Sequence, residues 1–171
     1  MSNEYVSIAA SSIVRICCDG FESKDWRGRF YTRYQEKPVS FRNAGELLER
    51  LEGFYNWLGY PQASMENRSF QKKPSERRAL EEPASVRGIS INQKGERSIV
   101  VNEEAMSKHQ GEKATFVVRI QYRQNASWQG QVTWAEKNKT VPFRSALELL
   151  KLIDSTEAAP EESWDRGDGQ L

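Results

Sequence analysis

Apolar and polar residues alternate along two stretches of the chain, and an apolar helical stripe follows each alternation. Every second residue from Phe116 to Tyr122 is apolar, which is the two-residue period of a β-strand. A second alternating run begins at Trp128, and Val141 with Phe143 supplies a third. Nearer the N-terminus the same order recurs at Val14, Ile16 and Cys18, at Trp26, Gly28, Phe30 and Thr32, and at Val39 and Phe41. Each stretch therefore predicts three successive strands.

A capped amphipathic helix is predicted after each group of strands. Asn43 stands three residues before Glu46, and Ser145 three residues before Glu148. This is the spacing of a capping box, in which side chain and backbone satisfy each other's unpaired groups. Apolar residues then recur along one helical face: Leu47, Leu48, Leu51, Phe54, Tyr55 and Leu58 in the first helix, and Leu149, Leu150 and Ile153 in the second. We expect each stripe to pack on the apolar face of its sheet, because neither face is stable alone in water.

The two stretches are similar enough to be copies of one unit. From Trp26 to Leu51 they align without a gap at an offset of 102 residues, and ten of those 26 positions are identical. Placing Ile13–Ile16 over Val117–Ile120 leaves two extra residues before Trp26 in the first copy. We therefore predict a two-layer α+β protein of two tandem βββα units, each a three-stranded antiparallel sheet with one helix packed on it. The units are expected to form a pseudo-dimer within one chain, through strand edges or helices.

The rest of the chain divides into extensions and linkers. We assign residues 1–11 to an N-terminal extension, 12–60 to the first unit, 61–85 to a polar linker, 86–102 to a central β-hairpin, 103–114 to a second linker, 115–156 to the second unit and 157–171 to an acidic disordered tail. From Asp154 onward there are six acids and one base, whereas residues 1–153 carry 24 bases and 18 acids. Such a tail either competes with an anionic partner or only aids solubility.

The composition excludes several classes of protein. No apolar run approaches the roughly 20 residues that span a bilayer, and the N-terminus lacks the features of a secretory signal, so we expect a cytoplasmic protein that does not bind membranes. Cys17 and Cys18 are adjacent and point to opposite faces of a strand, so we expect reduced thiols, one apolar in the core and one half-exposed. With His109 as the single histidine, zinc is not expected.

No residue pattern indicates catalysis. The chain has no phosphate-binding glycine loop, no nucleophile elbow and no metalloprotease motif. The repeated Glu46 and Glu148 are accounted for by the helix caps, and His109 lies in a polar linker without a partner in sequence. Gly28 and Gly130 are expected to leave room for the helix backbone. We predict no catalytic residue, no cofactor and no metal.

The strand positions that point away from the helices are the candidate binding face. In the first unit they are Arg15, Arg27, Arg29, Tyr31, Arg33 and Arg42, and in the second Arg119, Arg123, Gln129, Gln131 and Arg144. A guanidinium fork binds phosphate or carboxylate through two hydrogen bonds, which suits a nucleic acid or a protein. A solvated face is the alternative, with its charges balanced by acids such as Asp19, Glu22, Asp25 and Glu36.

Two resemblances bear on this face. The W-x-G motif, third strand and capped helix of each copy resemble the DNA-binding domains of the AP2/integrase type over about 40 residues. That resemblance implies a sheet in the major groove and points to Arg27, Arg29 and Arg33, and more weakly to Arg119 and Arg123. The second copy departs from the pattern, since it has glutamines in place of arginines and both Trp128 and Trp134 face inward.

More closely, the stretch TFVVRIQYRQNASWQGQVTW…FRSALELLKLID resembles a module of short uncharacterised proteins from clostridia-like bacteria. This resemblance implies a bacterial source, and no activity is known for the module. Taken together, the sequence predicts a non-catalytic interaction or scaffold protein whose partner is another protein. The alternative is a nucleic-acid-binding protein that uses the arginine-rich face of the first unit.

Overall fold

The structure is a computed structural model that describes residues 12–61, 99–123 and 127–157. In order, the elements of the first half are β1 (Val14–Glu22), β2 (Asp25–Thr32), β3 (Gln35–Phe41) and α2 (Ala44–Leu58). After the short helix α3 (Glu103–Ser107), the second half contains β4 (Ala114–Tyr122), β5 (Gln129–Trp134), the 3-10 turn η3 (Ala135–Lys137), β6 (Lys139–Phe143) and α4 (Ala146–Ser155).

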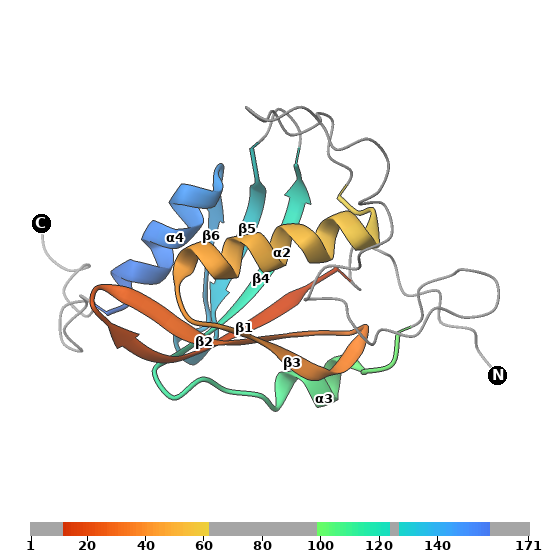
Figure 1. Ribbon diagram of the computed structural model, residues 1–171, viewed down its shortest axis with the longest axis horizontal. Coiled ribbons are helices and arrows are strands. Elements are labelled where there is room, and N and C mark those ends of the chain that lie inside the picture. The colour runs from red at the N-terminus through yellow and green to blue at the C-terminus, as the bar shows by residue number, and fades with distance from the viewer. Residues whose placement is uncertain (1–11, 62–98, 124–126, 158–171) are drawn as a thin grey trace, which may run out of the picture.

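All six strands form one antiparallel sheet in the order β3-β2-β1-β4-β5-β6 (Figure 1). The predicted α+β class is confirmed. The two halves meet where β1 pairs with β4, so they share one sheet through strand edges. The predicted central hairpin lies largely outside the described residues. Among those residues, no helix is long and apolar enough to cross a membrane.

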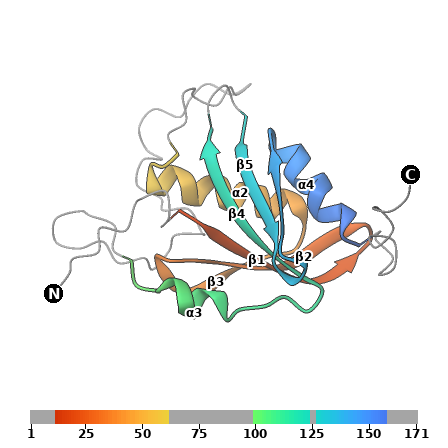
Figure 2. The ribbon, with the colours of Figure 1, turned by 180° about the vertical axis from the view of Figure 1, so that it is seen from behind.

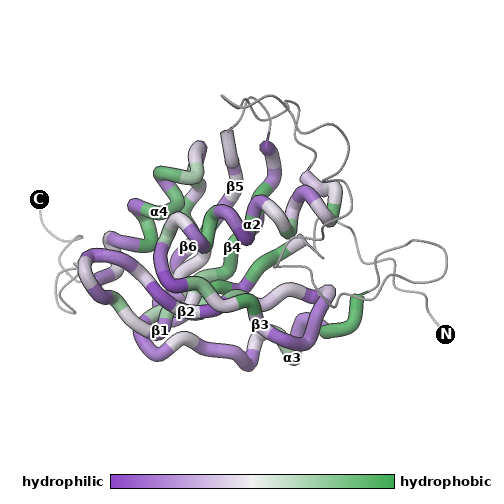
Figure 3. Tube along the Cα trace, in the orientation of Figure 1, coloured by the Kyte–Doolittle hydropathy of each residue, from purple (hydrophilic) through white to green (hydrophobic). Residues whose placement is uncertain are grey.

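Helices α2 and α4 cover the same face of the sheet, and the strands stand in front of them when the molecule is turned round (Figures 1 and 2). The predicted stripe of α2 is confirmed, because Leu47, Leu51, Phe54, Tyr55 and Leu58 are all buried. In α4, Leu149 and Ile153 are buried. Hydrophobic and hydrophilic positions alternate along the described chain as this packing requires (Figure 3).

Both predicted helix caps are present. The Asn43 side chain accepts a hydrogen bond from the Glu46 amide at 2.8 Å, and Ser145 Oγ accepts one from the Glu148 amide at 3.0 Å. The side chain of each glutamate accepts a hydrogen bond from the backbone amide of the residue before the cap. Glu46 accepts from the Arg42 amide and Glu148 from the Arg144 amide, both at 2.8 Å. The glutamates therefore complete the helix ends, as the sequence predicts.

The explanation predicted for Gly28 and Gly130 is wrong. A Cβ on Gly28 would lie 2.1 Å from the Cys17 carbonyl oxygen, and one on Gly130 would lie 2.0 Å from the Arg119 carbonyl oxygen. The crowding atoms belong to the neighbouring strand rather than to a helix. Both glycines are needed because two strand backbones approach too closely for any side chain.

Side chains also tie the two halves together across the core. Trp26 of β2 donates its indole N–H to Asp154 of α4 at 3.0 Å. From the other half, Arg123 Nη1 donates to the Asn56 side chain of α2 at 2.8 Å. The Tyr55 ring packs edge-on against Trp128, with ring centroids 6.2 Å apart. These contacts make one core from two groups of strands.

Candidate functional site

The sheet face opposite α2 and α4 is covered in one half of the molecule and bare in the other. Residues 99–113, which we call the strap, lie over β1 and β2, and α3 belongs to this strap (Figure 2). The strap is part of the segment predicted to be a hairpin end and a linker. The strap also reaches Thr115 and Val117 at the start of β4. From Arg119 onward, and over β5 and β6, this side of the sheet has no such cover among the described residues, and we call it the open face.

Arginines of the predicted binding face hold the strap by its main chain. Arg15 Nε donates to the His109 carbonyl at 2.5 Å, and Arg33 Nε donates to the Val101 carbonyl at 3.3 Å. The Arg33 carbonyl in turn accepts from the amides of Val100 and Val101. These side chains bind the protein's own backbone, so they are not presented to solvent.

Arg29 lies at the centre of the contact between sheet and strap. Its guanidinium donates to the Gln110 carbonyl at 3.1 Å, to the Tyr31 hydroxyl at 2.9 Å, and forms an ion pair with Asp19. The hydrogen bonds to Asp19 and Tyr31 raise the pKa of Arg29 above its ordinary value. The other Asp19 oxygen accepts from the Glu112 amide at 3.2 Å. One carboxylate therefore holds both the arginine and the strap backbone.

His109 of the strap stacks on Tyr31 of β2. The ring centroids are 3.7 Å apart and the planes differ by 7°. Burial lowers the pKa of His109 below 6.5, and the nearby charges of Arg29 and Arg15 lower it further. The neutral ring is therefore the form that the docked strap favours.

An apolar contact completes this interface. Met106 of α3 is 4% exposed and packs with Ile13, Cys17 and Tyr31. Cys17 is thus fully buried under the strap, and burial raises the pKa of its thiol to about 11. Cys18 is buried in the core on the other face. Both thiols are free, but the prediction that one is half-exposed is wrong, because the strap covers the second face.

The predicted arginine face therefore does not exist as one open surface. Arg15, Tyr31 and Arg33 are each only 8% exposed. Arg27 and Arg42 are exposed, yet each is paired with a glutamate, Glu22 at 3.3 Å and Glu46 at 3.2 Å. These two pairs agree with the alternative of a charge-balanced, solvated surface.

Arg123 was predicted on the outer face and lies on the helix side. A bulge shifts the β4–β5 register between Ile120 and Tyr122, which reverses the direction of the side chains beyond it. Arg123 is 5% exposed, donates to the Pro61 carbonyl at 2.8 Å and lies over the Tyr55 ring. Burial lowers the pKa of this guanidinium. Its role is to join the end of β4 to the end of α2.

The remaining predicted residues lie on or beside the open face. Strand register places Gln131 between Arg119 of β4 and Pro142 of β6. Tyr122 pairs with Gln129. The open face consists of Arg119, Gln121, Tyr122, Gln129, Gln131, Thr133, Thr140 and Pro142. Arg144 follows β6 and is also exposed.

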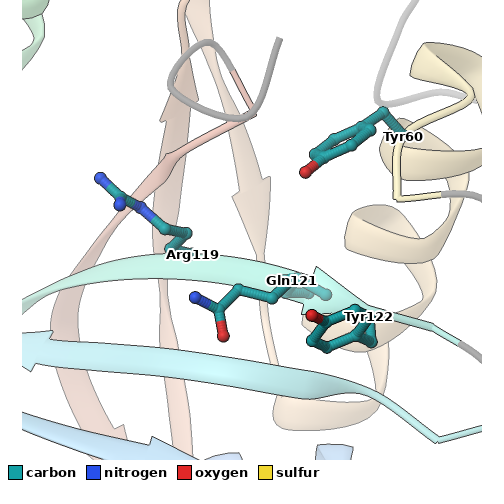
Figure 4. Close-up of a pocket in the computed structure, with 5 residues that line it drawn as sticks. Tyr60, Arg119, Gln121 and Tyr122 are labelled. Atoms are coloured by element: carbon teal, nitrogen blue, oxygen red, sulfur yellow. The ribbon is translucent and has the colours of Figure 1, made fainter. Parts of the chain in front are cut away.

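Gln121 and Tyr122 are members of this face that sequence reasoning missed. The alternation assigned Tyr122 to the apolar side, but the bulge turns it outward and leaves it 57% exposed. A hollow of about 250 Å³ lies beside this face, between the end of β4 and the end of α2, lined by Tyr60, Arg119, Ile120, Gln121 and Tyr122 (Figure 4). No pattern in the sequence signals a bulge at this position.

The outer strands discourage pairing with a further strand. β3 contains Lys37 and Pro38, and β6 contains Lys139 and Pro142. Proline lacks an amide donor and lysine resists burial, so both residues protect an edge. The open face, rather than an edge, is therefore the better candidate for contact with a partner.

The described residues contain no group of three or more His, Cys, Asp or Glu side chains placed to hold a metal ion.

No protein-family model, no curated protein and no solved structure shows significant similarity to this chain.

Proposed function

We propose that the protein is a non-catalytic interaction or scaffold protein built from a duplicated βββα unit. One copy has its outer sheet face occupied by the chain's own strap, and the other presents the open face to another protein. A cytoplasmic location belongs to the same proposal, because two buried free thiols suit a reducing compartment.

Strand register supports the duplication. Cys18 pairs with Gly28 and Ile120 pairs with Gly130, and a bulge follows in both strands. The offset of 102 residues therefore extends without a gap into β1 and β4, and Cys18 rather than Ile16 corresponds to Ile120. The two extra residues needed in the sequence alignment are then unnecessary.

The pairing between the halves has the same symmetry. Val14 pairs with Val118 and Ile16 with Phe116, and an offset of 102 exchanges these two pairs. The same offset maps the Arg15–Val117 pair onto itself, so a pseudo-twofold axis passes there. This is the arrangement expected when a unit that associates through an edge strand is duplicated within one chain.

One observation carries the functional proposal. The outer face of the first half holds a polypeptide segment through hydrogen bonds from Arg15, Arg29 and Arg33 to its carbonyls. The corresponding face of the second half has exposed polar side chains and no segment upon it among the described residues. A scaffold that binds a peptide main chain in one copy offers the same geometry, with different side chains, in the other.

The nucleic-acid alternative is less well supported. Three of the arginines that it requires are engaged with the strap, and Arg27 and Arg42 are paired with carboxylates. Neutralised phosphates supply most of the affinity in nonspecific nucleic-acid binding. The open face contributes Arg119, with Arg144 beside it, which is a small charge for such a ligand.

Affinity purification of the full chain from its native cell tests the proposal. We expect a defined partner to be recovered with the wild-type chain and lost with Arg119→Glu combined with Gln131→Glu. Arg27→Glu is the matched control, because Arg27 is exposed on the other half of the sheet. Recovery of the chain alone under gentle conditions would contradict the proposed function. Equal recovery of the partner with the wild type, the double variant and Arg27→Glu would contradict it as well.

A further inference from the structure

The open face combines an exposed positive charge, that of Arg119, with uncharged hydrogen-bonding groups. We propose that it binds an extended acidic segment of a partner protein, with a carboxylate of that segment seated against Arg119. This inference rests on the proposed function and specifies the chemistry of the partner.

The charge balance of the face is the first support. Arg119 is exposed, and its guanidinium makes no hydrogen bond or ion pair within residues 12–61, 99–123 and 127–157. No residue of the open face is acidic. Glu136, in the turn after β5, already accepts a hydrogen bond from the Thr115 amide at 3.0 Å. Within these residues Arg119 therefore has no carboxylate partner, and a guanidinium binds a carboxylate through two hydrogen bonds.

The neighbours of Arg119 suit a peptide main chain. Gln131 is its direct cross-strand partner, and Gln129 lies two residues away on the same face of β5. A glutamine amide both donates and accepts, so it matches the amide and carbonyl of a peptide group. The corresponding residues of the first half, Arg29 and Arg27, only donate. A segment that lies along β5 would meet these two amides in succession.

An aromatic anchor stands beside the charge. Tyr122 is 57% exposed and, with Tyr60 and Ile120, lines the hollow next to Arg119 (Figure 4). Exposed tyrosines of this kind are enriched among the residues that dominate binding energy. The hollow, of about 250 Å³, has space for one side chain and is lined by polar as well as apolar groups. We expect a side chain next to the carboxylate of the segment to enter it.

A second copy of the chain is a poorer occupant. Two copies that met through the same face around a twofold axis would enclose the Arg119 charges of both copies in one interface, and the face supplies no acid to balance them. A nucleic acid would gain little from so few cations. A polypeptide that carries its own carboxylates meets neither difficulty.

Selection from a random 12-residue peptide library on the immobilised full chain tests the proposal. We expect the recovered peptides to be enriched in Asp and Glu relative to the library. By fluorescence anisotropy, Arg119→Gln should weaken binding of the best peptide by roughly 10- to 100-fold, the loss expected for a charge-assisted hydrogen bond. Raising the salt concentration should weaken it as well. Arg27→Gln, the matched control, should leave the affinity unchanged.

The outcomes separate this inference from the proposed function. Peptides without acidic enrichment whose binding is lost in Gln131→Ala would overturn the acidic segment and leave an interaction face in place. An unlabelled dT12 oligonucleotide that competes with the probe, and binds less well to Arg119→Gln, would overturn both in favour of nucleic acid. Failure to recover any peptide that depends on the open face would overturn both as well. Thermal unfolding of each variant checks that these exposed substitutions leave the fold intact.

Discussion

We expect the strap to open independently of the core, and substitution of Met106 is the most direct test of this expectation. Met106 is 4% exposed and is the apolar side chain by which α3 packs on Ile13, Cys17 and Tyr31. Met106→Ala removes most of that contact without touching the arginines that hold the strap backbone. We therefore expect docking of the strap to weaken in this variant while the sheet and its two helices stay folded.

The magnitude follows from the burial of this side chain. Truncation of a buried methionine to alanine costs about 2–5 kcal/mol. Since each 1.4 kcal/mol changes an equilibrium constant tenfold, the population with the strap open should rise roughly 30- to 4,000-fold. The three arginine contacts to strap carbonyls remain, so the strap is weakened rather than removed.

The labelling rates of the two adjacent thiols measure opening of the strap and of the core separately. Cys17 lies under the strap and Cys18 lies in the core on the other face of the sheet, and both are fully buried. Labelling with a chromogenic disulfide reagent in the Cys18→Ala background follows strap opening, because Cys17 is then the only thiol. The Cys17→Ala background follows exposure of the core through Cys18. Met106→Ala should accelerate labelling of Cys17 by roughly 30- to 4,000-fold and change the labelling rate of Cys18 only slightly.

Two results would refute this reasoning. Equal acceleration at Cys17 and Cys18 would mean that the strap and the core open as one cooperative unit. No acceleration at either thiol would mean that the arginine contacts alone hold the strap. In the first case the strap is not a separable occupant of the first face, and the comparison with the open face loses its basis. In the second case Met106 contributes nothing to docking.

Three further predictions concern the backbone and two titrating groups. Gly130→Ala should destabilise the fold by roughly 1–3 kcal/mol or more, since the new Cβ would lie 2.0 Å from the Arg119 carbonyl oxygen; urea unfolding should show no such loss for Gly45→Ala, an exposed helical position with 3.4 Å to its nearest neighbour. The Arg42 amide, then the Arg42 and Arg50 side chains, hold the pKa of Glu46 at about 2 against an ordinary 4.5, so the stabilisation is complete above pH 4.5 and is lost as the pH falls toward 2. Glu46→Gln should reduce the loss of unfolding free energy between pH 5 and pH 2.5, measured by urea unfolding at both pH values. An unchanged loss would contradict the assignment. Because burial and the charges of Arg29 and Arg15 lower the pKa of His109 from 6.5, strap docking should weaken as the pH falls below 6.5. Thiol labelling of Cys17 at pH 7.5 and pH 5 with a reagent active in acid checks this, and His109→Phe, which keeps the stack on Tyr31, should abolish the difference.

Much of the fold follows from local pattern. The alternation of apolar residues identifies the strands of both halves, because side chains on a strand point to opposite faces in turn. The helix starts follow from the spacing of Asn43 and Glu46 and of Ser145 and Glu148, and these caps involve only neighbouring residues. The apolar stripe of α2 identifies its buried side correctly.

The candidate site depended on contacts between residues far apart in the chain. The same alternation that identifies the strands placed Arg123 outside and Tyr122 inside, and both positions are reversed by one bulge in β4. A bulge is decided by the register between two strands, which the sequence of either strand does not show.

The use of the outer sheet face was likewise decided only by the tertiary structure. The sequence alone identified the residues of that face in the first half, including Arg15, Arg29 and Arg33, and their capacity to donate hydrogen bonds. It did not determine their partners, because the strap that occupies them lies as many as 94 residues away along the chain. Periodicity reports which way a side chain points relative to its own strand, whereas its exposure depends on what else packs there. For this protein that difference moved the candidate binding surface from the arginine-rich half to the glutamine-rich half.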